Sequence, residues 1–138
     1  MTDEEALTLT IWGEARGEPI EGKLGVAAVM RNRLLTHYRG ARNYVDVCTA
    51  PAQFSAWQQE ATQMLAEQDM LDGDPSLAHH PDPVLHLCLE IARATIAGLL
   101  PDVTRGANHY YADSIPTPHW AVDVPAVQLG HQRFLVAA

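Results

Sequence analysis

The first stretch of the chain carries apolar side chains at helical spacing. Leu7 and Ile11 fall on one line of a helical wheel drawn over residues 3–16, and Leu9 and Trp12 fall on another. A helix that is apolar over so much of its circumference is typical of one surrounded by the rest of the domain. We therefore expect a central helix at the N-terminus.

Further patterns predict the remaining elements. Leu85, Leu89, Ala92 and Ile96 repeat at helical spacing, which indicates a helix with one core-facing side. A second predicted helix carries small residues, which favour its close approach to the first helix. These residues are Gly22, Gly25, Ala27 and Ala28. We expect helices over residues 20–37, 58–71 and 84–99, a mostly irregular segment at 38–57 with a short turn near 45–49, and short strands at 109–111 and 132–136. This order predicts an α+β fold that is mainly helical, with a small antiparallel β-sheet.

Length and charge narrow the class of protein. A chain of 138 residues is long enough for a single domain spanning residues 1–138 and short for two. Its formal net charge of −8 disfavours binding to nucleic acid, which basic proteins attract over long range.

The N-terminus is acidic and lacks the basic and apolar regions of a secretory signal, and no apolar run approaches the ~20 residues that span a bilayer. We expect synthesis in the cytoplasm and no stable membrane insertion.

Glu14 is the most informative single residue. On the helical wheel it falls on the line of Leu7 and Ile11, where an apolar side chain would otherwise be expected. A carboxyl group in apolar surroundings has a raised pKa and can hold a proton near neutral pH, which suits a general acid. Two other interpretations stay open from spacing alone: a solvated carboxylate at the helix end, or an ion pair with Arg16 or another nearby arginine.

Five segments together resemble a known family. They are Trp12–Pro19 (WGEARGEP), Val26–Arg33 (VAAVMRNR), Pro51–Trp57 (PAQFSAW), Gly106–Tyr111 (GANHYY) and Leu129–Phe134 (LGHQRF). In this order they resemble the catalytic domain of SleB-type cell-wall hydrolases, which includes spore cortex-lytic enzymes and phage-encoded relatives. The resemblance implies a lysozyme-like fold and activity on peptidoglycan glycan strands, without a cofactor. If the chain acts on the cell wall, a separate targeting or export partner is expected to bring it there.

The resemblance also assigns roles to residues. Glu14 falls on the catalytic glutamate of the family. The strand with His109 and Tyr110, and the following Trp120, would line the cleft opposite this glutamate. The residues themselves, without the resemblance, assign Glu18 to a cap or structural ion pair in preference to a second catalytic role, because Gly17 and Pro19 interrupt the helix.

A second group of candidate binding residues lies in the predicted irregular segment. Gln53, Phe54 and Ser55 offer an amide, an apolar ring and a hydroxyl group, which suit the edges and faces of a sugar. An equally good interpretation makes the aromatic residues core anchors for this segment, and the same alternative holds for Trp120.

Other chemistries find little support in the sequence. The seven histidines form no metal-binding motif, so no metal site is expected, and Ser55 lacks the Gly-x-Ser-x-Gly context of a nucleophile. Cys48 and Cys88 could pair, but buried free thiols fit better in a chain without an export signal.

We therefore expect a glycosidase that cuts the β-1,4 bond between N-acetylmuramic acid and N-acetylglucosamine. Since only Glu14 has a convincing place, a lytic transglycosylase that makes 1,6-anhydromuramic ends is favoured over enzymes that need two carboxylates. A hydrolytic muramidase, and a non-catalytic wall-binding or virion module, remain as alternatives.

Overall fold

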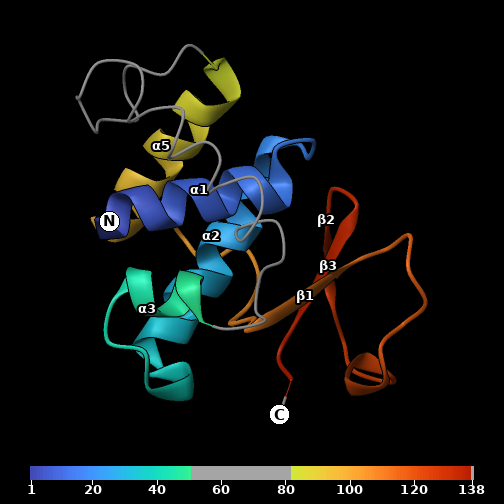
Figure 1. The fold of residues 1–138 in the computed structure, drawn as a ribbon. Helices are drawn as coiled ribbons and strands as arrows, with labels where there is room; N and C mark the ends of the chain where they lie inside the picture. The colour runs from blue at the N-terminus through green and yellow to red at the C-terminus, as the bar shows by residue number, and fades with distance from the viewer. Residues whose placement is uncertain (51–81, 138) are drawn as a thin grey trace.

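The computed structural model describes residues 1–50 and 82–137, which form a helical part and a small sheet (Figure 1). The predicted helix at 58–71 and the candidates Gln53, Phe54 and Ser55 lie outside the described residues. Within the described part, no helix is both long enough and apolar enough to cross a membrane.

Helix α1 (Asp3–Ala15) is the central element, as its apolar pattern predicts. It begins with a capping box, in which the Thr2 side chain accepts from the backbone N–H of Glu5 and the Glu5 side chain accepts from that of Thr2. Leu7, Leu9 and Ile11 are fully buried. Figure 1 shows α1 between α5 (Pro83–Ile96) on one side and α2 (Ile20–Leu35) and α3 (Tyr44–Thr49) on the other, and α1 contacts all three.

The sheet has three antiparallel strands in the order β1-β3-β2. Strands β1 (His109–Ala112) and β3 (Gln132–Leu135) lie where the pattern predicts strands, and Tyr110 is the register partner of Phe134. The third strand, β2 (Val127–Leu129), is not predicted, because three residues are too few to display an alternating pattern. Two short 3₁₀ helices, η1 (Tyr38–Gly40) and η4 (His119–Ala121), complete the described elements.

The structure corrects one expectation about packing and adds to another. Ile96 is 41% exposed, since it is the last residue of α5 and extends past the core that buries Leu85, Leu89 and Ala92. Gly25 also serves the sheet: a methyl group there would lie 2.5 Å from the Phe134 ring. The small residue lets Phe134 of β3 reach α2, and this contact joins the sheet to the helices.

Candidate active site

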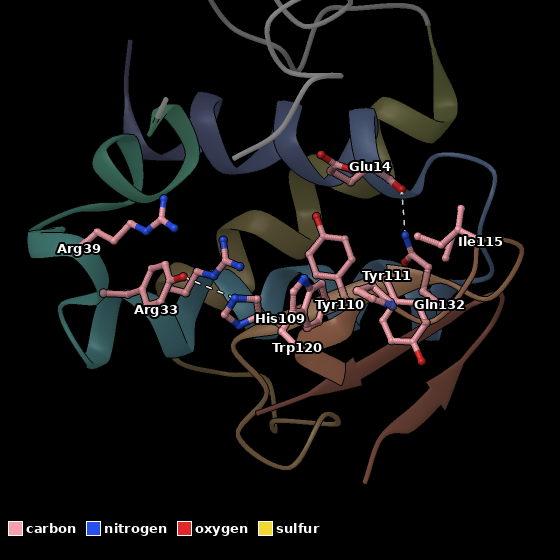
Figure 2. Close-up of a pocket in the computed structure, with 12 residues that line it drawn as sticks. Glu14, Arg33, Arg39, His109, Tyr110, Tyr111, Ile115, Trp120 and Gln132 are labelled. Atoms are coloured by element: carbon pink, nitrogen blue, oxygen red, sulfur yellow. Dashed lines mark hydrogen bonds between the residues drawn. The ribbon is translucent and has the colours of Figure 1, made fainter. Parts of the chain in front are cut away.

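Glu14 lies in the last turn of α1, on the wall of a cavity of about 600 Å³ (Figure 2). The opposite wall is formed by β1 and β3, which contribute His109, Tyr110 and Gln132. The cavity thus lies between the central helix and the sheet. The contact between Gly25 of α2 and Phe134 of β3 holds the sheet against the helical part.

Burial raises the pKa of the Glu14 carboxyl group from its ordinary 4.5 to about 7, and the positive charge of Arg33 opposes part of this rise. No side chain in the described part of the chain donates a hydrogen bond to this carboxyl group. At neutral pH the protonated and ionised forms are therefore both well populated. Such a group can donate a proton and later accept one, as general acid–base catalysis requires.

The backbone around Glu14 is held by two polar side chains. The buried ammonium group of Lys23 donates to the carbonyl oxygens of Arg16, at 3.3 Å, and of Glu18. The Gln132 amide donates from Nε2 to the carbonyl oxygen of Glu14 at 3.3 Å. The bonds to Glu14 and Arg16 satisfy carbonyl groups that the helix end leaves without partners, and the cation suits the negative end of the helix dipole. They hold the end of α1 against α2 and β3.

Two polar atoms on the cavity wall are buried without a hydrogen-bond partner among the described residues. They are the Tyr110 hydroxyl oxygen and the Gln132 Oε1 atom. Burial, reinforced by the nearby Glu14, raises the pKa of Tyr110 well above its usual value, so the hydroxyl group stays protonated and able to donate. Because buried polar groups in folded proteins are nearly always paired, these atoms suit a ligand that both accepts and donates hydrogen bonds.

Aromatic rings cover another part of the cavity. The Trp120 ring, carried by η4, lies 5.1 Å from the His109 ring and 5.9 Å from the Tyr111 ring. Tyr38 contacts His109 edge-on at 5.9 Å. Apolar ring faces beside polar groups are the surface that a sugar ring prefers.

Glu18 and Arg16 are not among the residues that line this cavity. The Glu18 carboxylate accepts from the backbone N–H of His131 at 2.6 Å, in the turn between β2 and β3, and lies 3.2 Å from the His131 ring nitrogen Nδ1. A methyl group on Gly130 would lie 2.7 Å from the same carboxylate, so this turn packs tightly on Glu18. The Arg16 guanidinium lies 4.4 Å from the centre of the Trp12 ring.

The cavity also contains residues that sequence reasoning missed: Arg33, Tyr38, Arg39 and Gln132. The signal for Arg33 was present, since it follows Val26 and Met30 on the apolar stripe of α2, as Glu14 follows Leu7 and Ile11 on α1. Arg33 is only 5% exposed. For Arg39 there was no comparable signal.

Comparison with known proteins agrees with this architecture. A family model described as cell wall hydrolase matches residues 17–135, a range that begins just after Glu14. No match to a curated protein was found.

Two solved structures share the fold. The catalytic domain of the Bacillus cereus SleB protein is 24% identical, with a TM-score of 0.66, over 96% of this chain and 88% of that one. The catalytic domain of the germination-specific lytic transglycosylase SleB from Bacillus anthracis is 23% identical, with a TM-score of 0.64, over 96% of this chain and 93% of that one.

Proposed function

The chain belongs to the cell wall hydrolase family, and from that premise we propose that it cleaves the glycan strands of peptidoglycan with Glu14 as general acid. The observation that carries the proposal is the Glu14 carboxyl group, with a pKa of about 7, on the wall of a cavity large enough for sugar rings. A carboxyl group with an ordinary pKa would be almost fully ionised at neutral pH and would rarely hold the proton that a leaving group needs.

The bond proposed for cleavage is the β-1,4 bond between N-acetylmuramic acid and N-acetylglucosamine. Glu14 donates its proton to the bridging oxygen while the bond from this oxygen to the muramyl anomeric carbon breaks. The muramyl 6-hydroxyl oxygen then attacks the same carbon, and the Glu14 carboxylate accepts the proton of that hydroxyl. The products are a 1,6-anhydromuramic end and a free glucosamine 4-hydroxyl group, so the enzyme acts as a lytic transglycosylase.

The set of carboxyl groups around the described cavity supports this route over hydrolysis. Among the described residues that line the cavity, Glu14 is the only one with a carboxyl group. Glycosidases that use water commonly need a second carboxylate about 5–10 Å from the first. Glu18 does not line the cavity and is engaged by the backbone of His131. An internal nucleophile already held in place removes the need for that second group.

Other cavity residues are proposed to hold the substrate. The Tyr110 hydroxyl group and the Gln132 Oε1 atom would bond to polar groups of the sugar, such as its N-acetyl amide, because neither has a partner among the described residues. Trp120 and His109 would support the apolar face of a sugar ring. These contacts would hold the anomeric carbon within reach of Glu14.

Cleavage is tested by following the turbidity of purified peptidoglycan with wild-type protein, Glu14→Gln and a matched control, Glu21→Gln. Glu21 is exposed and does not line the cavity, so its substitution removes the same charge without touching the site. Glu14→Gln should clear the suspension at least about 100-fold more slowly, as loss of a general acid predicts, and Glu21→Gln should match wild type. Near wild-type clearing by a folded Glu14→Gln protein would refute the role of Glu14. No clearing by wild-type protein would favour the non-catalytic alternative.

A further inference from the structure

Two arginine side chains, which the proton-transfer chemistry does not use, form one end of the cavity. Arg33 reaches it from α2, and Arg39 reaches it from η1. In Figure 2 both arginines lie at one end of the pocket, and Glu14 and Gln132 lie toward the other. The cavity is therefore polarised, with its positive charge gathered away from Gln132, although the protein as a whole has a formal charge of −8.

The two guanidinium groups are close enough to act on the same neighbours. Both lie over the Tyr38 ring, with the Cζ atom of Arg33 at 4.9 Å and that of Arg39 at 5.3 Å from its centre. Burial lowers the pKa of His109, and the charges of Arg33 and Arg39 lower it further. His109 is thus kept neutral, and it adds no third charge to this end.

The protein holds these like charges together by specific contacts. Arg33 donates from Nε to the carbonyl oxygen of Asn108 at 2.7 Å. Arg39 has a left-handed backbone (φ 53°), a conformation that residues other than glycine seldom adopt, and it lines the cavity. Arg39 forms no ion pair with any described residue. The neighbouring Asp46 carboxylate accepts from the backbone N–H of Arg42 at 3.0 Å.

An anion is the ligand that relieves the repulsion between the buried Arg33 and the exposed Arg39, whose positive charge acts on Arg33. Arginine binds carboxylates through paired hydrogen bonds, and these bonds are stronger in a site that is partly shielded from water. In a peptidoglycan strand, N-acetylglucosamine carries no carboxylate. Each muramyl residue carries a lactyl group, which ends in a carboxylate or continues into a stem peptide that has carboxylates of its own.

We propose that Arg33 and Arg39 form a subsite for a carboxylate of the muramyl side chain. The proposal rests on the proposed action on glycan strands, and it adds how the cleft distinguishes the two alternating sugars. A muramyl carboxylate held at this end fixes the register of the strand, because glucosamine offers nothing for the arginines to bind. The bond presented to Glu14 is then always of the same kind.

The test measures equilibrium binding to the Glu14→Gln protein, so that no substrate is consumed. Three probes are compared: peptide-free glycan strands with lactyl carboxylates, the same strands with these carboxylates converted to primary amides, and strands that keep their stem peptides. Each is titrated into Glu14→Gln alone and into Glu14→Gln combined with Arg39→Gln or with Arg42→Gln. Arg42 is exposed and lies outside the cavity, three residues from Arg39, so it controls for the loss of one positive charge.

A strand with carboxylates should bind about tenfold or more tightly than the amidated strand, as expected for a hydrogen-bonded charged pair. Arg39→Gln should bring this ratio close to one, and Arg42→Gln should leave it unchanged. If the peptide-free strand with carboxylates binds more tightly than its amide, the ligand of the subsite is the lactyl carboxylate. If only the peptide-bearing strand binds more tightly, the ligand is a carboxylate of the stem peptide. Equal binding of all three probes, binding of none, or equal effects of both arginine substitutions would overturn the subsite.

Wild-type cleavage, measured in parallel, separates the two proposals. Cleavage without a carboxylate preference in binding would leave the proposed function in place and remove the subsite. A carboxylate preference that depends on Arg39, without cleavage, would retain the subsite and remove the proposed function.

Discussion

Replacing Glu14 by glutamine should stabilise the protein at alkaline pH while it abolishes cleavage. The carboxyl group has a pKa of about 7 in the folded protein, against an ordinary 4.5, because burial disfavours its charged form. Between these two values the folded state holds a proton that the unfolded state has lost. The free energy of unfolding therefore falls as pH rises through this window, and above it the ionised Glu14 destabilises the fold by a constant amount.

The size of the effect follows from the shift in pKa. A difference of about 2.5 units, at about 1.4 kcal/mol per unit, corresponds to roughly 3 kcal/mol. Glutamine has nearly the same shape and keeps a polar amide, but it carries no charge at any of these pH values. The two proteins should thus unfold with similar free energies at pH 4, and Glu14→Gln should be more stable by about 3 kcal/mol at pH 8.

Urea denaturation of both proteins from pH 4 to pH 8, followed by circular dichroism, measures this difference. Glu21→Gln serves as the control, since Glu21 is exposed on the first turn of α2 and its loss should produce no such rise. A stability difference that is the same at pH 4 and pH 8 would refute a raised pKa for Glu14. It would also remove the physical basis for its role as a proton donor.

Three further substitutions test the packing of the site and the division of roles within it. Gly25→Ala should lower the free energy of unfolding by about 1–3 kcal/mol, because the added methyl group would lie 2.5 Å from a buried aromatic ring. Gly17→Ala is the control and should cause no such loss, since no atom lies within 4 Å of its added methyl group; thermal unfolding compares the two variants. Tyr110→Phe should leave the stability of the fold unchanged or higher, since it removes a buried hydroxyl group with no partner among the described residues. The same variant should cleave peptidoglycan at least about tenfold more slowly, and cleavage at the wild-type rate would exclude a contact between this hydroxyl group and the substrate. Glu18→Gln should lower the free energy of unfolding by about 1 kcal/mol, because it weakens the contact with the β2–β3 turn. It should slow cleavage far less than Glu14→Gln does, and equal inactivation of both folded variants would favour a two-carboxylate mechanism.

Much of the helical part could be predicted because its signals are local. The apolar lines of α1 and α5 lie within a few turns of sequence, and each predicted helix of the described part begins and ends within three residues of the observed one. Strand β2 escaped prediction because its pairing with β3 depends on a partner outside its own three residues. The role of Gly25 escaped for the same reason, since the ring it accommodates is more than a hundred residues away.

The same distinction between local signals and contacts made only in the folded chain separates the predictable residues of the site from the others. Glu14 could be selected because a carboxylate interrupts an apolar stripe, and the same rule applied to α2 would have selected Arg33. Gln132 lies within a segment that carries the family resemblance, but its interest comes from an unpartnered Oε1 atom, which only the folded chain reveals. Arg39 lies in a short 3₁₀ helix with a left-handed backbone, and nothing in the local sequence indicates that conformation.

The central claim is that one carboxyl group cleaves the muramyl bond with the substrate's own hydroxyl group as nucleophile. The most direct measurement is mass spectrometry of peptidoglycan digested by the wild-type protein in heavy-oxygen water. The account predicts 1,6-anhydromuramic ends, one water lighter than reducing ends, with no heavy oxygen at the anomeric carbon. Reducing muramyl ends that carry heavy oxygen from the first time point would contradict it and establish hydrolysis, and reducing glucosamine ends would show that the other glycosidic bond is cut.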